Sequence, residues 1–163
     1  MNPKMIVLLV VAALPACGGD GGPAPPTSLP PASSFSVSVT PTPLVAVDCT
    51  PAVCSSTPGA QYAVIAGLTV TESGGVGGTV NSITLTFRTP DNMELGTLTI
   101  AAGDIIDIAG TNRVNGRGTL IVRGIGAAYR LSDGSRQGTL TFTVAITDDR
   151  GTFTTQSVAV PVV

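Results

Sequence analysis

Hydrophobic and polar residues alternate along much of the chain after residue 60. The clearest run covers 139–147, where threonines occupy most of one face. The other face of this run carries four large apolar side chains: Leu140, Phe142, Val144 and Ile146. The same period of two recurs in 62–70 and 83–88. Because successive side chains of a strand point to opposite faces of a sheet, this pattern predicts half-buried antiparallel strands.

Shorter runs of branched and small residues extend this pattern over the rest of 35–163. They predict further strands near 35–39, 44–47, 95–100, 118–123, 126–131 and 152–162. The turn signals between strands include GGVGG at 74–78, for which we expect a flexible hairpin connection, and DDRG at 148–151. We find no convincing amphipathic helix, and expect at most one loose turn within 101–109. The fold class is therefore all-β: an antiparallel β-sandwich of about seven to nine strands.

Composition excludes several kinds of chemistry. The chain has 163 residues, enough for one ordinary domain, and contains no histidine and no tryptophan. Its single lysine is Lys4. Ser-His-Asp catalysis, histidine zinc sites and a lysine Schiff base in the folded part are thus absent. The formal charge of −2 disfavours nonspecific binding to nucleic acid. We expect a protein that is not an enzyme and has no cofactor.

The N-terminus carries a short apolar run after one positive charge. Met5 to Leu14 is too short to span a bilayer but suits the core of a signal peptide. Leu14-Pro15-Ala16-Cys17 resembles the lipobox of bacterial lipoproteins, although Pro15 replaces the small residue usual there. The resemblance implies that residues 1–16 are removed and that Cys17 carries diacylglycerol and acyl chains. The alternative is an ordinary secretory signal with an incidental cysteine.

Residues 17–34 form the expected link between anchor and domain. After Cys17 they are rich in glycine and proline and show no apolar periodicity, which predicts a disordered, flexible tether. Gly18, in place of aspartate, resembles lipoproteins exported to the outer membrane of Gram-negative bacteria. We therefore expect anchoring to the bacterial cell envelope, at the outer membrane if the source is Gram-negative.

Two cysteines remain after Cys17 is assigned to lipid. Cys49 and Cys54 are close in sequence, and an even remainder in an exported protein predicts a disulfide. The alternatives are a redox dithiol, which usually has two residues between its cysteines, and a thiolate metal site, which lacks further ligands here.

The last 24 residues carry a second resemblance. In 140–163 a strand ends in Thr147-Asp148-Asp149 with Gly151 closing the turn, and a Thr/Val-rich strand follows. This arrangement resembles the closing hairpin of bacterial immunoglobulin-like and PKD-type domains. It implies an immunoglobulin-like sandwich over 35–163, of the kind that acts as a spacer, adhesin or docking module on bacterial surfaces.

Acidic residues offer two candidate sites, each with a plainer interpretation. Asp148 and Asp149, with Asp133, could bind calcium through clustered oxygens, but aspartates also stabilise turns through their own backbone, which we favour. Asp104 and Asp107 could form an acid/base pair in a cleft, but we expect them to be solvated.

Charge is distributed unevenly along the sequence. Residues 90–110 carry four carboxylates and no base, whereas 111–137 carry five arginines and one aspartate. A basic strip that includes Arg113 and Arg117 could bind anionic glycans or phospholipid headgroups. We favour instead mutual neutralisation of the two segments across neighbouring strands.

These observations predict a lipid-anchored, non-enzymatic envelope module that binds a protein partner or supports an assembly. An exposed edge strand offers β-augmentation as the mode of binding. The alternative is a glycan-binding module, against which the lack of aromatic residues counts. A hydrolase that uses only carboxylates such as Asp104 and Asp107 is a third candidate.

Overall fold

The computed structural model describes residues 30–50, 54, 57–132 and 134–163. The predicted signal peptide, Cys17 and Asp133 lie outside the described residues, as does most of the predicted tether. Among the described residues, no helix has the length and apolar character needed to cross a membrane.

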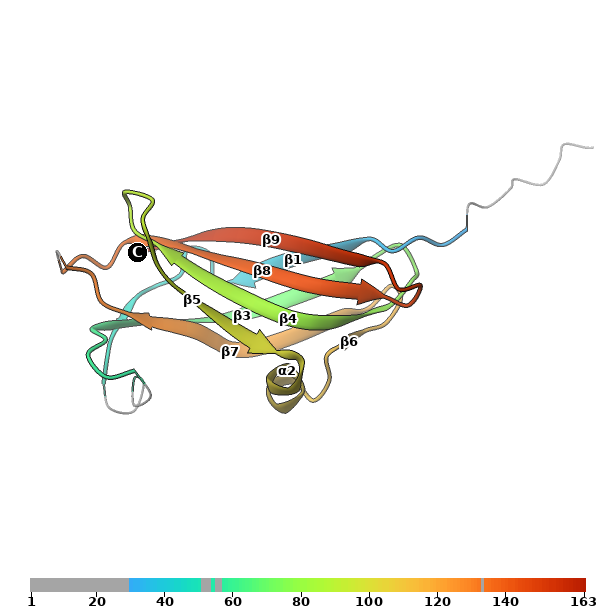
Figure 1. Cartoon of the computed structure of the whole chain (residues 1–163), viewed down its shortest axis with the longest axis horizontal. Coiled ribbons are helices and arrows are strands. Elements are labelled where there is room, and N and C mark those ends of the chain that lie inside the picture. The colour runs from blue at the N-terminus through green and yellow to red at the C-terminus, as the bar shows by residue number, and fades with distance from the viewer. Residues whose placement is uncertain (1–29, 51–53, 55–56, 133) are drawn as a thin grey trace, which may run out of the picture.

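The described chain forms two antiparallel sheets that pack face to face (Figure 1). The first sheet contains β1 (Phe35–Thr40), β2 (Val47–Asp48), β3 (Tyr62–Glu72) and β7 (Thr119–Tyr129). The second contains β4 (Gly78–Arg88), β5 (Glu94–Ala101), β6 (Arg113–Val114), β8 (Gly138–Asp148) and β9 (Phe153–Val162). The predicted all-β sandwich of about seven to nine strands is confirmed.

The core lies between the sheets and follows the alternation in the sequence. On β8 the four apolar positions predicted to face inward are fully buried. The same holds for Leu68 and Val70 on β3 and for Ile83 on β4. Two of the predicted strands, 118–123 and 126–131, are one strand, β7. Its register against β3 shifts at Gly124, whose φ of +73° suits glycine and forms a bulge.

The chain itself crosses between the sheets at one end of the β1–β9 side of the sandwich. After β1, residues 44–46 leave the first sheet and run parallel to the end of β9. Leu44 N–H donates to Pro161 O at 2.9 Å, and Ala46 N–H donates to Val163 O at 2.8 Å. The chain then returns to the first sheet as β2, beside β3. The predicted strand at 44–47 is therefore a crossing between the sheets, which pairs with the end of β9 at 161–163.

The glycine-rich segment at 74–78 is not the expected hairpin connection. It joins β3 in the first sheet to β4 in the second, so the two strands that it links do not pair. A Cβ atom at Gly77 would lie 2.8 Å from Val114 O, and one at Gly78 would lie 2.8 Å from Thr147 O. Gly77 and Gly78 are therefore required because other backbone segments pack closely against them. The amino-acid sequence did not reveal this role.

The expectation of at most one loose turn in 101–109 is also wrong. Residues Ala102–Ala109 form the helix α2. The carboxylate of Asp104 accepts a hydrogen bond from Ala101 N–H at 3.2 Å at the start of the helix. At its end, Gly110 adopts φ +77° and donates to Ile106 O at 2.7 Å. Burial of Ile105 fixes the helix against the sandwich, a tertiary contact that overrides the weak periodicity.

Candidate functional site

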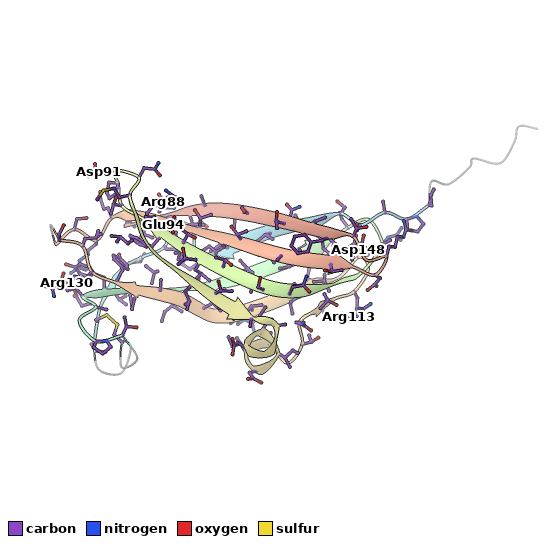
Figure 2. The ribbon with its side chains drawn as sticks, in the orientation of Figure 1. Arg88, Asp91, Glu94, Arg113, Arg130 and Asp148 are labelled. Carbon is purple, nitrogen blue, oxygen red and sulfur yellow. A yellow bond between two sulfur atoms is a disulfide. The ribbon has the colours of Figure 1, made fainter. Side chains whose placement is uncertain are left out.

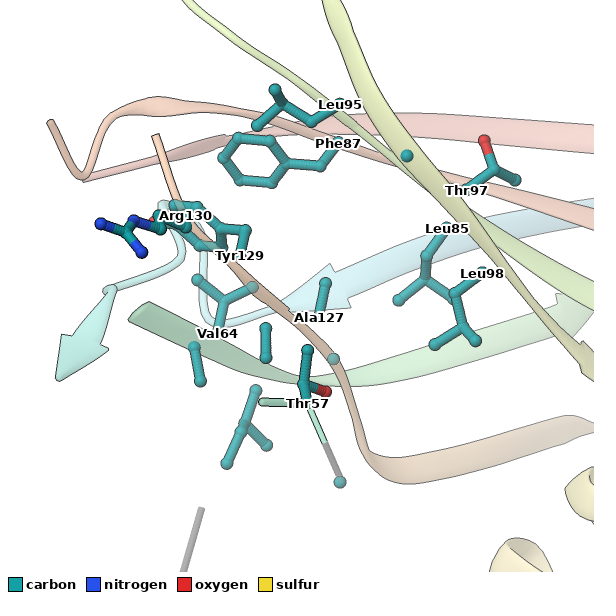
Figure 3. A pocket seen from close by; sticks show the side chains of 16 residues that line it. Thr57, Val64, Leu85, Phe87, Leu95, Thr97, Leu98, Ala127, Tyr129 and Arg130 are labelled. Atoms are coloured by element: carbon teal, nitrogen blue, oxygen red, sulfur yellow. The ribbon is translucent and has the colours of Figure 1, made fainter. Parts of the chain in front are cut away.

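The side of the sandwich opposite the crossing segment is open. Here the outer edge of β5 in one sheet faces the outer edge of β7 in the other, and within the described chain no strand pairs with either edge. A groove of about 620 Å³ lies between them (Figure 3). Helix α2 contacts both β5 and β7 and so covers part of this side, but none of its residues lines the groove. This volume falls in the range of typical ligand pockets, so the groove is the leading candidate site.

The groove has an apolar floor and an apolar rim. Val64, Leu85 and Phe87 from the core reach its floor. Leu95 and Leu98 of β5 stand on its rim with 44% and 51% of their surface exposed. Figure 3 shows these side chains gathered around the space between β5 and β7. Apolar groups on both sides would bury further surface if an occupant entered.

Exposed apolar residues gather around the same open side. Of the eleven large hydrophobic residues exposed in the described part of the chain, seven lie on β3, β5, α2 or β7, or in the turn before β5. These seven are Ile65, Met93, Leu95, Leu98, Ile106, Ile108 and Ile121. By contrast, the outward positions of β4 and β8 are largely threonine. Three of the seven, Ile65, Leu95 and Leu98, line the groove itself, and exposed apolar side chains beside a groove are typical of an interaction surface.

Small residues leave room for another backbone along the groove. Gly124, Gly126 and Ala128 line it on β7, and Gly96 lines it on β5. No atom lies within 4 Å of the Cβ position at Gly96 or Gly124, whereas a Cβ atom at Gly126 would clash with Val64 O, so Gly126 is required by the packing of β7 against β3. Glycines within strands commonly mark places where another backbone approaches closely.

The edge of β7 also offers free backbone groups to the groove. Tyr129 O accepts a hydrogen bond from Gln61 N–H at 3.0 Å, which places that carbonyl on the β3 side of the strand. In an antiparallel ladder, successive residues direct their N–H and C=O groups to opposite sides. Gly126 and Ala128 therefore direct theirs away from β3, toward the open edge.

An aromatic cluster holds one end of the groove. Tyr129 stacks on Phe87 with ring centroids 4.2 Å apart. Its hydroxyl donates to Arg136 O, and the Tyr62 hydroxyl donates to Gly134 O at 2.9 Å. Burial, together with the nearby Tyr62, raises the pKa of Tyr129 to about 12, against a smaller opposing effect of Arg136. The phenol is thus neutral at ordinary pH and serves as a hydrogen-bond donor.

The candidate calcium ligands near the β8–β9 turn are engaged in other bonds, as expected for the turn role that we favour. One carboxylate oxygen of Asp148 accepts from the N–H groups of Arg150 and Thr152, at 3.0 and 2.8 Å, and the other accepts from Ser33 Oγ at 2.7 Å. The hydrogen bond from Ser33 and that from the Thr152 backbone lower the pKa of Asp148. Asp149 forms an ion pair with Arg113 at 2.7 Å. The described part of the chain contains no group of three metal-ligating side chains.

The second acidic pair lies on α2. The carboxylate of Asp104 accepts the hydrogen bond from Ala101 N–H at the start of the helix. Both Asp104 and Asp107 are exposed. Neither lines the groove between β5 and β7. The structure thus places this predicted acid/base pair on an open helix surface rather than in a cleft.

The expected neutralisation between residues 90–110 and 111–137 is wrong. Three ion pairs occur among the described residues, and each joins one of these segments to a partner outside the other: Arg88–Glu94, Arg113–Asp149 and Arg136–Asp48. Figure 2 shows Arg113 and Asp148 toward one end of the sandwich and Arg130 at the other end. The arginines therefore do not form one continuous strip.

Glu72 is a structural site that sequence analysis missed. Its side chain is 1% exposed, yet it accepts four backbone hydrogen bonds. The donors are the N–H groups of Ser34 (3.0 Å), Gly74 (2.8 Å), Gly75 (2.9 Å) and Arg117 (2.7 Å). Burial raises the pKa of this carboxyl, but the four donors outweigh it and lower the pKa of Glu72 to about 2. Arg117, a candidate binding residue, contributes its backbone here.

The predicted disulfide is confirmed. Cys49 and Cys54 are bonded, with their Cα atoms 5.5 Å apart. Cys49 N–H donates to Gln61 O at 2.8 Å, so the disulfide loop is attached to the residue that precedes β3.

Comparisons with known proteins support the fold alone. No family model and no curated protein sequence matches the chain. A Northeast Structural Genomics Consortium target, SoR45, covers 79% of this chain and 86% of its own, with 11% identity and a TM-score of 0.57. A protein from Bordetella pertussis assigned as ApaA covers 78% of this chain and 89% of its own, with 15% identity and a TM-score of 0.52. The chain is thus similar in architecture to solved bacterial and structural-genomics proteins of much the same size.

Proposed function

We propose that this protein is a lipid-anchored bacterial envelope protein whose sandwich binds an extended segment of a protein partner. The segment would add a strand to the free edge of β7, the mode called β-augmentation. The observation that carries the proposal is the groove itself, where a free strand edge, an apolar floor and small residues occur together. The membrane anchor is supported by the lipobox-like sequence that ends at Cys17.

The attachment of the N-terminal segment supports this arrangement. Ser33 and Ser34 are held by Asp148 and Glu72, and Arg150 donates to Pro31 O. These contacts lie at one end of the sandwich, where the chain enters (Figure 1). The aromatic end of the groove lies toward the other end, with the β4–β5 turn. A domain tethered through its N-terminus would therefore present the groove away from its point of attachment.

The binding mode is tested by removing one backbone donor from the free edge. Ala128→Pro deletes an N–H that points away from β3, so the β3–β7 ladder keeps its hydrogen bonds. The matched control is Ala159→Pro on β9: Pro161 O faces outward to Leu44, so Ala159, two residues earlier, also points its N–H away from the sheet. Thermal denaturation verifies that both variants remain folded.

The readout is crosslinking in the envelope of the source bacterium. A photoreactive amino acid at Leu98 should crosslink to a defined protein, whereas the same label at Thr143, on the outer face of the same sheet and away from the groove, should not. Ala128→Pro should abolish the crosslink and Ala159→Pro should retain it. A crosslink that survives Ala128→Pro, or equal crosslinking from Thr143, would refute binding at β7.

The anchor is tested separately. Cys17→Ser should move the protein from the membrane fraction to the soluble fraction, because each buried CH₂ of the lipid contributes about 0.8 kcal/mol to membrane binding. Mass spectrometry of the native protein should show acyl chains on Cys17. An unmodified thiol at this residue would refute the anchor and leave the groove proposal to its own test.

A further inference from the structure

We infer that the segment bound in the groove is acidic: it carries a side-chain carboxylate that pairs with Arg130, next to apolar side chains that alternate into the groove. This inference rests on the proposed function and specifies the chemistry of the partner. It follows from the charge of the groove, from its shape and from the occupants that these features exclude.

The charge among the described residues that line the groove is positive. Among the described residues that line it, Arg130 is the only charged one. Its side chain is exposed, and no carboxylate of the described chain pairs with it. Arg123, which lies on β7, is likewise exposed and has no ion pair within the described residues. The guanidinium group of arginine binds carboxylates through two parallel hydrogen bonds. An acidic partner would therefore gain a contact that a neutral one lacks.

The shape of the groove fits an extended chain. The stretch of β7 that lines it runs from Gly124 to Tyr129, which corresponds to roughly 17 Å at about 3.3 Å per residue, and Arg130 follows directly after the strand. Every second side chain of a strand paired there would point to the floor formed by Val64, Leu85 and Phe87. The residues between them would point outward, where Arg130 also lies, at the end of the groove held by Tyr129 (Figure 3).

Two occupants from the protein itself fit less well. Pairing of β7 with β7 of a second copy would bring two copies of Arg123 and Arg130 into one interface, and like charges opposed across strands destabilise pairing. The glycine/proline-rich residues 18–34 of another copy include five prolines, which have no N–H to donate to a ladder. Charge and hydrogen bonding thus both favour a different, acidic chain.

The inference is tested with three designed peptides of eight residues, each acetylated and amidated so that only side chains carry charge. All three alternate valine with threonine, and their terminal positions hold glutamate, glutamine or lysine. Binding is measured by the change in NMR amide shifts of the full sandwich domain. We expect the glutamate peptide to bind at least tenfold more tightly than the lysine peptide, with shifts concentrated on β7. The preference should weaken as salt is added.

Charge reversal provides the decisive comparison. Arg130→Glu should reverse the preference in favour of the lysine peptide. Arg113→Glu introduces the same change at the far end of the sandwich and should leave the preference unaltered. Equal binding of all three peptides, or an unchanged preference in Arg130→Glu, would overturn the acidic partner while leaving strand addition intact. If no peptide binds, or if shifts occur away from β7, both proposals fail.

Discussion

The carboxylate of Glu72 accepts a hydrogen bond from the backbone N–H of Arg117 at 2.7 Å, although 45 positions separate the two residues. Arg117 has a φ of +58°, a left-handed conformation that non-glycine residues seldom adopt. The same carboxylate holds Ser34, which directly precedes β1, and Gly74 and Gly75, which follow β3. One buried charge therefore joins three segments at the end of the sandwich where the chain enters.

Glu72→Gln should lower the free energy of unfolding at pH 7 by about 2–3 kcal/mol, because an amide can no longer satisfy four donors as a charged acceptor. The pKa of Glu72 is lowered from 4.5 to about 2 in the folded state, so its contribution is complete above pH 4.5 and is lost as the pH falls toward 2. The difference between the two proteins in urea denaturation should shrink over that interval. Glu94→Gln, in an exposed ion pair, should change stability by less than about 1 kcal/mol; an equal loss would contradict the role of Glu72.

Alternation predicted the sandwich well because it is a local property. The inward faces of β3, β4 and β8 can be read from their own residues, and the disulfide follows from two nearby cysteines. The groove cannot be read in this way, since it depends on which strands lie at the edges. Residues 44–46 pair with the chain at 161–163, and no described strand pairs with the outer edge of β7, an outcome of topology that no single stretch of sequence encodes.

The difference between local patterns and long-range contacts also explains which features the sequence did not predict. No predicted strand included Glu72, and two of its four donors, Ser34 and Arg117, lie 38 and 45 positions away in the sequence. The helix α2 forms because Ile105 is buried by the sheets rather than because its own pattern is strong. Ion pairs form between residues that are close in space, so Arg113 pairs with Asp149 rather than with a carboxylate of residues 90–110.

Calcium should have no effect on the melting temperature of the protein. The oxygens of Asp148 are already bonded to Ser33, Arg150 and Thr152, and Asp149 is paired with Arg113, so these groups would have to exchange existing bonds for the ion. Differential scanning calorimetry with millimolar calcium and with a chelator provides the measurement. A melting temperature that rises with calcium would contradict this assignment of the turn and would restore Asp148 and Asp149 as ligands.

Ile105→Ala should destabilise the protein by about 2–4 kcal/mol, since this side chain is fully buried and its removal leaves a cavity. The adjacent Ile106 provides a matched control, because it belongs to the same helix and is largely exposed. Ile106→Ala should change the free energy of unfolding by about 0.5 kcal/mol or less. Urea denaturation of both variants makes the comparison. Similar losses for the two would mean that α2 does not pack as described.

Ionisation of Tyr129 should occur only at strongly alkaline pH. The chain contains two tyrosines, so the Tyr62→Phe variant isolates Tyr129 for titration by the ultraviolet absorbance of the phenolate. Because Tyr62 contributes to the raised pKa of Tyr129, the midpoint in this variant should lie below that of the parent but still well above 10, since burial is the larger cause. The pKa of Tyr129 in the folded protein is raised from 10.0 to about 12, so the stability that depends on the neutral phenol is complete below pH 10 and is lost as the pH rises toward 12.

Tyr129→Phe removes the hydrogen bond to Arg136 O and should lower the free energy of unfolding by about 1 kcal/mol at pH 7. This variant should also lose less stability than the parent between pH 10 and 12. A midpoint near 10 in the folded Tyr62→Phe protein would show that water reaches the phenol, and that the aromatic end of the groove is open rather than packed against Phe87.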